Sequence, residues 1–400
     1  MNKKKISIIL IFFIAILSTF VFVKNISNVE ITNEVNNKSK KNRNLLTMNL
    51  EQTAGTGDYK TVTQSEWPTD EYEFNKELSR CENGSEISWD DTKKVVVVLG
   101  NLSDKCYVYF DIARFDKLCN ASTLACHVAK LYTGTQGENG IYYHNSSLTN
   151  GAGDNNYRYA GANPNNYICL GSDATTCPDD NLFRIIGVFG GKVKVIRAKS
   201  VVKMHWDTSN YNTWSISSLN TYLNGTYLTS IGTLSDKIDM ATWKVGGNTW
   251  DNISVSTAKE VYDYEIKNPS TTASTGETEY SAKIGLMYVS DYMFAVLQDN
   301  WTLVAYNSND ATKDYRAVKA ENWLYLGSDE YTITRSSKYS GDVFAIYSSG
   351  EVYSYSVSCN SDEPLPCSVY AKYARPSFYL ISSVEYSGGT GTSSDPIRIN

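Results

Sequence analysis

The sequence predicts an α+β fold in which antiparallel β-hairpins carry two or three inserted helices. The chain of 400 residues contains 30 Tyr, and it is also rich in Ser, Thr, Asn and Gly, a combination typical of strands joined by many turns. Gly190-Gly191 separates two apolar runs, as the tight turn of a hairpin requires. Other segments place apolar residues three and four positions apart, which indicates amphipathic helices. A helical bundle would contain more Ala, Leu, Glu and Lys.

The N-terminus predicts a membrane anchor. Lysines at positions 3–5 precede an apolar run over residues 6–23, which is close to the ~20 residues that cross a bilayer as a helix. Positive charge before the run places the N-terminus in the cytoplasm and the rest of the chain outside the cell. No small-residue cleavage site follows the run. We therefore expect a single-pass membrane protein whose residues 6–23 contact the lipid bilayer and whose body is extracellular; secretion after signal cleavage is the alternative.

Composition and patterning divide the chain into five segments. A polar stretch without apolar periodicity follows the anchor, and this is typical of a flexible linker. A short β-rich unit, a helical connector and a large body come next. The expected segments are the anchor at 1–24, the linker at 25–66, a small disulfide-stapled β unit at 67–111, the connector at 112–139 and the body at 140–400.

The eight cysteines agree with export to an oxidising compartment, where pairs of this kind form structural disulfides. The sequence alone does not fix their connectivity, but pairing between neighbours along the chain is the simplest arrangement. Zinc would need C-x-x-C or Cys/His clusters, which are absent from this sequence. We therefore expect no metal and no cofactor. The expected disulfides are Cys81–Cys106, Cys119–Cys126, Cys169–Cys177 and Cys359–Cys367.

Turn signals and apolar spacing place the individual elements. Strand-forming runs on either side of a turn predict hairpins, and apolar residues at helical spacing after a capping residue predict helices. Thr257 and Glu260 match a capping box. The expected hairpins span residues 95–110 around Gly100-Asn101, 183–197 around Gly190-Gly191 and 343–357 around Ser349-Gly350. The expected helices span 112–132, 214–231 with a cap at Ser217 or Ser218, 257–267, and a short stretch capped by Ser290 or Asp291 that ends at Leu297.

Charge and motif content exclude two functional classes. The formal net charge is −6, and residues from 44 onward carry 29 basic against 41 acidic side chains. A body of this charge repels the phosphate backbone of nucleic acids. The sequence also contains no G-x-S-x-G, H-E-x-x-H or Walker motif, and its adjacent carboxylates are typical of turns. We therefore expect neither a nucleic-acid partner nor an enzyme.

The order of the C-terminal segments resembles a known group of proteins. The segments Lys283–Tyr292, Asn322–Ser328, Tyr331–Arg335 and Ala374–Leu380 look like a C-terminal domain of unknown function in uncharacterised exported proteins of low-GC gut bacteria. More distantly, an Asn-Trp segment, a hairpin and a late Arg-Pro strand resemble the fold of formylglycine-generating enzymes and C-type lectins. This resemblance implies a C-type-lectin-like α+β body, preceded by the small β unit and an N-terminal transmembrane helix. It does not extend to calcium binding, because the Glu-Pro-Asn and Trp-Asn-Asp triplets are absent.

Aromatic and arginine side chains are the candidate ligand contacts. The two tryptophans that flank the polar residues 207–212 are expected at an exposed surface, where they would stack on a ligand. The tryptophan and the arginines of the resembling segments each have an alternative to ligand binding. For the tryptophan it is packing in the core, and for the arginines it is contacts that hold strands together. The candidates are Trp206, Tyr211, Trp214, Trp323, Arg335 and Arg375.

Location, composition and resemblance together favour recognition. Surfaces rich in Tyr, Asn and Ser combine rigid contact area with adaptable hydrogen bonds. The leading hypothesis is a membrane-anchored extracellular recognition or adhesion protein that binds a glycan, host or envelope partner. The alternatives are a non-catalytic structural component of the envelope and an envelope-sugar hydrolase with an unrecognised site.

Overall fold

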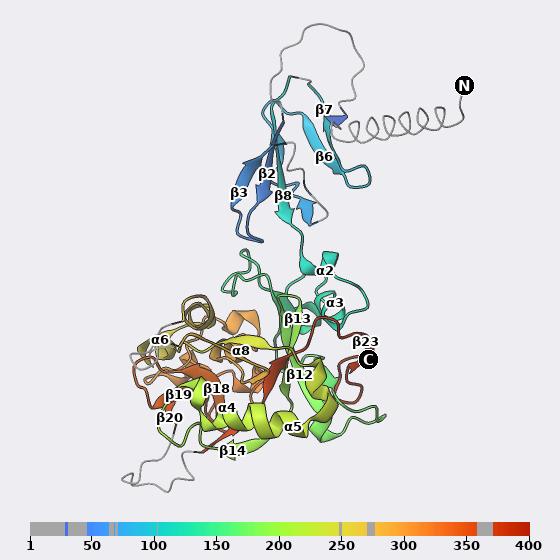
Figure 1. Ribbon diagram of the computed structural model, residues 1–400. Coiled ribbons are helices and arrows are strands. Elements are labelled where there is room, and N and C mark those ends of the chain that lie inside the picture. Colours follow the sequence, from blue (N-terminus) through green and yellow to red (C-terminus); the bar gives the residue numbers. More distant parts are fainter. Residues whose placement is uncertain are drawn as a thin grey trace, which may run out of the picture. The chain divides into compact units, whose positions relative to one another are not determined.

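The chain folds into two compact units, Met1–Arg114 and Phe115–Asn400, which we call the N-terminal unit and the body. The computed structural model describes residues 29–30, 46–63, 68, 71–101, 103–247, 250–269, 277–357 and 371–400. Among the described residues, the N-terminal unit consists of strands, and the body combines mainly antiparallel strands with short helices (Figure 1). The α+β character predicted from the sequence is therefore observed.

The predicted fold class needs one correction, which concerns its transmembrane helix. Among the described residues, every helix is too short or too polar to cross a membrane. The apolar run at 6–23, which led to that prediction, lies outside the described residues. Over the described residues the observed fold class is therefore α+β, and no helix among them is long and apolar enough to cross a membrane.

The N-terminal unit contains two small sheets, in the orders β1-β7-β6 and β3-β2-β8-β4, with β5 also paired to β8. Strand β2 runs parallel to β8, so part of the predicted linker at 25–66 forms the centre of a sheet. The strands are β1 (Val29–Glu30), β2 (Leu46–Glu51), β3 (Tyr59–Val62), β4 (Tyr72–Phe74), β5 (Arg80–Cys81), β6 (Glu86–Asp90), β7 (Val95–Leu99) and β8 (Cys106–Ile112).

The predicted hairpin at 95–110 is wrong in its pairing, although both of its strands exist. Strand β7 pairs with β6, and β8 pairs with β2, β4 and β5. Asp104 lies in the connection between the two strands. Its carboxylate accepts hydrogen bonds from the backbone N–H groups of Asn83 (2.8 Å) and Ser85 (3.0 Å). These bonds tie the connection to the 83–85 turn, and β7 forms a hairpin with the preceding strand β6.

The body is organised around a seven-stranded sheet of order β17-β22-β13-β12-β10-β9, with β11 also paired to β12. The hairpin predicted at Gly190-Gly191 is confirmed as β12–β13, and positive φ angles of 54° and 77° at these glycines match a tight hairpin turn. The strands are β9 (Ile141–Tyr143), β10 (Tyr157–Tyr159), β11 (Tyr167–Cys169), β12 (Leu182–Phe189), β13 (Lys192–Arg197), β17 (Ile284–Gly285) and β22 (Ser377–Tyr379).

A five-stranded sheet of order β14-β21-β18-β19-β20 completes the main core of the body, and two two-stranded sheets, β15-β16 and β23-β24, flank it. The hairpin predicted at 343–357 is confirmed as β19–β20. The strands are β14 (Val202–Met204), β15 (Ala241–Lys244), β16 (Glu279–Ala282), β18 (Glu330–Arg335), β19 (Asp342–Ile346), β20 (Val352–Ser356), β21 (Lys372–Ala374), β23 (Tyr386–Gly388) and β24 (Arg398–Ile399).

The helices of the body are short and pack against these sheets. Helix α3 packs on β12 and β13, and α8 lies between α7 and the strands β18 and β19. The α-helices are α2 (Phe115–Leu118), α3 (Leu124–Ala129), α4 (Ser218–Tyr222), α5 (Leu228–Ser230), α6 (Trp250–Val255), α7 (Ala258–Tyr262) and α8 (Val289–Met293). Short 3₁₀ and π turns extend them, notably η5 (Leu223–Tyr227), η6 (Gly232–Lys237) and η7 (Asp263–Lys267).

The predicted helix starts are partly correct. Ser217 caps α4 by accepting a hydrogen bond from the N–H of Asn220, and Thr257 and Glu260 form the predicted capping box of α7. Asp291 does not cap α8: it is the third residue of that helix and bonds back to the cap, Tyr288. The predicted helix at 112–132 is interrupted between α2 and α3, where Thr123 begins a new helix.

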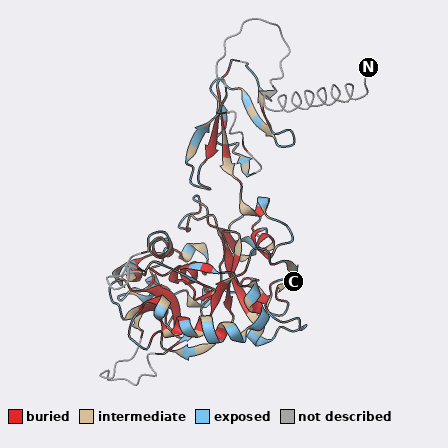
Figure 2. Ribbon diagram, viewed as in Figure 1, coloured by how far each residue is buried: buried red, intermediate tan, exposed pale blue. Residues whose placement is uncertain are grey.

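Three of the four expected disulfides are present. They join Cys81 to Cys106, Cys119 to Cys126 and Cys169 to Cys177; the pair Cys359–Cys367 lies outside the described residues. Buried residues follow the central strands of the body (Figure 2). The N-terminal unit has a separate, much smaller core of Met48, Leu50, Val96, Val108 and Phe110, which gives a physical reason for its disulfide.

Candidate functional site

The expectation that Trp206 and Trp214 are exposed is wrong, because both are fully buried. Their rings lie 5.1 Å apart, and the ring of Trp206 also packs against Tyr331. The polar segment between them is held by its own side chains: Asp207 accepts hydrogen bonds from three backbone N–H groups, and Asn212 donates to three carbonyls. The polar residues thus fold the segment, and the tryptophans anchor it in the core.

Of the other four candidates, only Tyr211 is presented to solvent, with 50% of its surface exposed. Trp323 is buried and donates from its indole nitrogen to the carbonyl of Tyr159. Arg375 forms a buried ion pair with Glu330 at 2.5 Å, and Arg335 donates to the carbonyl of Glu277. Both arginines therefore hold elements of the fold together, and the six candidates do not form one surface.

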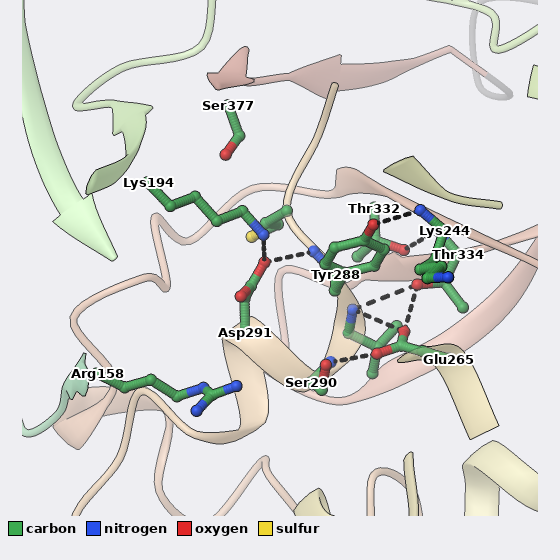
Figure 3. A network of polar contacts seen from close by, with 12 residues as sticks. Arg158, Lys194, Lys244, Glu265, Tyr288, Ser290, Asp291, Thr332, Thr334 and Ser377 are labelled. Atoms are coloured by element: carbon green, nitrogen blue, oxygen red, sulfur yellow. Dashed lines mark hydrogen bonds and ion pairs between the residues drawn. The ribbon is translucent and has the colours of Figure 1, made fainter. Parts of the chain in front are cut away.

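Sequence reasoning missed a buried polar network around the start of α8 (Figure 3). The carboxylate of Glu265, on η7, accepts hydrogen bonds from the N–H groups of Val289 and Ser290, both at 3.0 Å, and from the hydroxyl of Thr334 on β18. Burial raises the pKa of Glu265 to about 7, against the opposing effect of these donors. The phenol oxygen of Tyr288 accepts from the N–H of Lys244 at 2.7 Å.

The same network contains a buried lysine. Lys194 comes from β13, and its ammonium lies 2.5 Å from the carboxylate of Asp291 on α8, with both side chains almost fully inaccessible to solvent. Arg158, paired with Asp154, extends toward the same region (Figure 3). The Lys-Val-Lys-Val alternation of β13 is typical of a strand with one exposed face, so the sequence gives no warning that its second lysine is buried.

Two adjoining hollows on the surface of the body form what we call the loop cleft. The larger has a volume of about 650 Å³ and the smaller about 540 Å³, and both are lined by Gly171 and Thr233. One wall is the loop closed by the disulfide Cys169–Cys177, and the other includes η6. Arg398 supports the loop by donating to two of its carbonyls, both at 3.1 Å.

The larger hollow of the loop cleft contains polar groups that the fold leaves without hydrogen bonds. Arg197 and Tyr227 line it and are both more than nine-tenths buried. Arg197 donates to the backbone carbonyl (2.6 Å) and the carboxylate (3.0 Å) of Asp180, but its Nε and the Tyr227 hydroxyl have no hydrogen-bond partner among the described residues. Burial raises the pKa of Tyr227 to about 12, although the charge of Arg197 and a side-chain contact with it oppose this. The two side chains are close together, but Arg197 Nε and the Tyr227 hydroxyl do not reach hydrogen-bond geometry with each other. Unpaired polar atoms of this kind are costly unless water or a ligand satisfies them.

In the part of the chain that the structure describes, no group of three or more His, Cys, Asp or Glu residues is placed to hold a metal ion. Comparison with known proteins identifies no relative: no family model, no curated protein and no solved structure matches this chain. The resemblance to C-type-lectin-like proteins therefore stays a prediction.

Proposed function

We propose that the protein is exported and that its body is a recognition module, which binds a glycan in the loop cleft. The observation that carries this proposal is the pair of unsatisfied polar atoms, Arg197 Nε and the Tyr227 hydroxyl, at the larger hollow. A sugar hydroxyl can accept from the first and exchange hydrogen bonds with the second. The carboxylate of Asp180 and the ring of Tyr222 line the same hollow, and they add a hydrogen-bond acceptor and an aromatic surface.

Two further features support this function. The volume of each hollow of the loop cleft falls in the range of ligand sites, which are ~300–1,000 Å³. One of its walls is closed by a disulfide and supported by Arg398, so a ligand would meet a preorganised surface and lose less free energy in ordering it. The three disulfides also support export, because such bonds persist mainly in oxidising compartments.

The test is binding of the purified full chain to a glycan panel, comparing wild type with Tyr227→Phe. This substitution removes a single hydroxyl, and loss of one hydrogen bond of about 1 kcal/mol corresponds to roughly five-fold weaker binding. The matched variant is Tyr211→Phe, which removes the same group from the exposed tyrosine outside the cleft. Thermal unfolding of all three proteins shows whether the fold is intact.

Three outcomes are informative. Weaker binding by Tyr227→Phe, with Tyr211→Phe unchanged, supports the loop cleft. The reverse pattern would place the ligand near Tyr211 and contradict the cleft. If the folded wild type binds no glycan of a panel that includes neutral, amino and acidic sugars, the proposal of glycan recognition is wrong.

A further inference from the structure

Lys194 is an unusual residue in the body, because its charged group is buried with too few partners. A lysine ammonium has three N–H donors, yet within the described part of the chain its only hydrogen-bond acceptor is Asp291, at 2.5 Å. The side chain is only 1% exposed. Burying an ammonium costs several kcal/mol unless its donors are satisfied, so a simple ion pair leaves this site only partly compensated.

The surroundings of the amine exclude water. Its nitrogen lies 4.4 Å from the ring centre of Tyr288, and the rings of Trp243, Tyr379 and Phe189 follow at 5.5, 5.6 and 5.7 Å. These aromatic residues come from the two-stranded sheet, the N-terminal cap of α8 and the seven-stranded sheet, so several elements enclose the pair. The enclosure keeps the amine and the carboxylate in contact and keeps solvent away from them.

Local backbone features hold the two groups in place. Lys194 lies opposite Gly187, where the β12–β13 register shifts; irregularities of this kind change the direction of nearby side chains. Any side chain at Gly187 would collide with the backbone, because a Cβ there would lie 1.9 Å from the carbonyl oxygen of Tyr157. On the other side, the N–H of Tyr288 donates to the same carboxylate oxygen of Asp291 that contacts the lysine, at 2.8 Å.

We propose that Lys194 and Asp291 become joined by an isopeptide bond between the lysine nitrogen and the Asp291 side-chain carbon. In this step an ammonium and a carboxylate condense: the N–C bond forms, one C–O bond breaks, and that oxygen leaves as water with two protons from the ammonium. One proton stays on the nitrogen of the neutral amide. The reaction is balanced within the pair and needs no oxidant or other reactant.

Proximity and environment both favour this reaction. Groups fixed in contact behave as if each were present at effective concentrations on the order of 10⁵–10⁸ M, and exclusion of water suppresses the reverse hydrolysis. Burial lowers the pKa of Lys194, and although Asp291 opposes this effect, the charge of Arg158 reinforces it. The amine therefore reaches its neutral, nucleophilic form more readily than an exposed lysine does. The product also replaces a buried charge pair with a neutral group that has a single donor.

The test is mass spectrometry of the folded full-length chain after its disulfides are reduced and alkylated. We expect the wild type to be lighter than its sequence mass by one water molecule, and trypsin to leave residues 193–197 joined to the peptide that contains Asp291. Lys194→Arg keeps the ion pair but supplies no reactive amine, and Asp291→Ala removes the acceptor, so neither variant should lose water. The matched control is Lys192→Arg, because Lys192 pairs with Asp239 at the same 2.5 Å distance but is 41% exposed.

Loss of one water in the wild type and in Lys192→Arg, but not in the other two variants, would establish the bond. A folded wild type of full sequence mass, whose Lys194 reacts with an amine reagent after denaturation, would show an ion pair only and overturn the proposal. A cross-link that maps to any residue pair other than Lys194 and Asp291 would also overturn it. Neither the experiment nor the bond depends on ligand binding in the loop cleft.

Discussion

Two lysines of strand β13 pair with aspartates at the same distance but in different environments. The nitrogen–oxygen distance is 2.5 Å both for Lys192 with Asp239 and for Lys194 with Asp291. The side chain of the first lysine is 41% exposed and that of the second is 1% exposed. An exposed pair exchanges freely with water and contributes little to stability, typically 0–1 kcal/mol. A buried pair cannot exchange its hydrogen bonds with water, so its contribution to stability depends on whether the two side chains stay charged.

The difference shows that a contact distance alone does not determine what a pair does. Water competes for the ammonium of Lys192, whereas four aromatic rings surround that of Lys194. A third pair, Arg375 with Glu330, is buried to the same degree at the same 2.5 Å distance, but it uses a guanidinium, which stays protonated in proteins and is a poor nucleophile. Of these three pairs, only Lys194 with Asp291 combines burial with a group that can react.

The largest expected effect is a difference in the free energy of unfolding between the variants of the two lysines. A bond between residues 97 positions apart restricts the unfolded chain, and closing a loop of about that length stabilises a protein by about 4–5 kcal/mol in the chain-entropy model. Lys194→Arg should therefore lose about that much in urea unfolding, whereas Lys192→Arg should stay within about 0.5 kcal/mol of wild type. Equal, small losses in both variants would mean that the buried pair contributes no more than its exposed neighbour.

The second prediction concerns the buried pair that cannot react. Glu330→Gln keeps the shape of the side chain but leaves the Arg375 charge without its counter-ion, and breaking a buried pair in this way costs about 3–5 kcal/mol. Arg375 also donates to the carbonyl of Leu324 at 2.6 Å, so its displacement would disturb the segment before β18. Urea unfolding measures the loss. Glu385→Gln, at an exposed glutamate, is the control and should change stability by less than about 0.5 kcal/mol.

Local signals in the sequence predicted local structure well. The β12–β13 hairpin and the capping box of α7 depend on residues close together in the chain, and both were predicted correctly. The prediction of a hairpin at 95–110 failed because β7 pairs with the preceding strand β6 across the short turn at 91–94, and β8 pairs with β2, β4 and β5. Strand β2 was assigned to a linker, although Leu46, Met48 and Leu50 alternate as a half-buried strand requires; the polar residues around this short run hid the signal.

The candidate sites were harder to predict, because burial is a property of the assembled sheets. Trp206 and Trp214 have polar neighbours in sequence but apolar neighbours in space. Lys194 belongs to a strand whose alternating sequence predicts one exposed face. That face is exposed only if nothing covers the sheet, and here helices and a second sheet cover it. Arg197 and Tyr227 are 30 positions apart and come to line the same hollow only in the folded body. No spacing rule predicts such contacts.

The last prediction uses Glu265, a buried carboxylate that has only neutral hydrogen-bond donors. Its pKa is raised from 4.5 to about 7 by burial, so the folded protein holds a proton that the unfolded chain releases between these values. The stability that Glu265 contributes is therefore fully present below about pH 4.5, falls as the pH rises to about 7, and then levels off, a change of about 3 kcal/mol. Glu265→Gln mimics the protonated form and should remove this slope from urea unfolding measured between pH 5 and 8.

A second variant sharpens this test. Thr334→Val removes a donor that favours the charged form of Glu265, so the fall in stability should still begin near pH 4.5 but level off at a higher pH than in the wild type. If the slope persists in Glu265→Gln, another group titrates in this range, and Glu265 is not the carboxylate that holds the proton. If the slope disappears, Glu265 is the group that holds the proton: its carboxylate is buried, and the groups that donate to it are all uncharged.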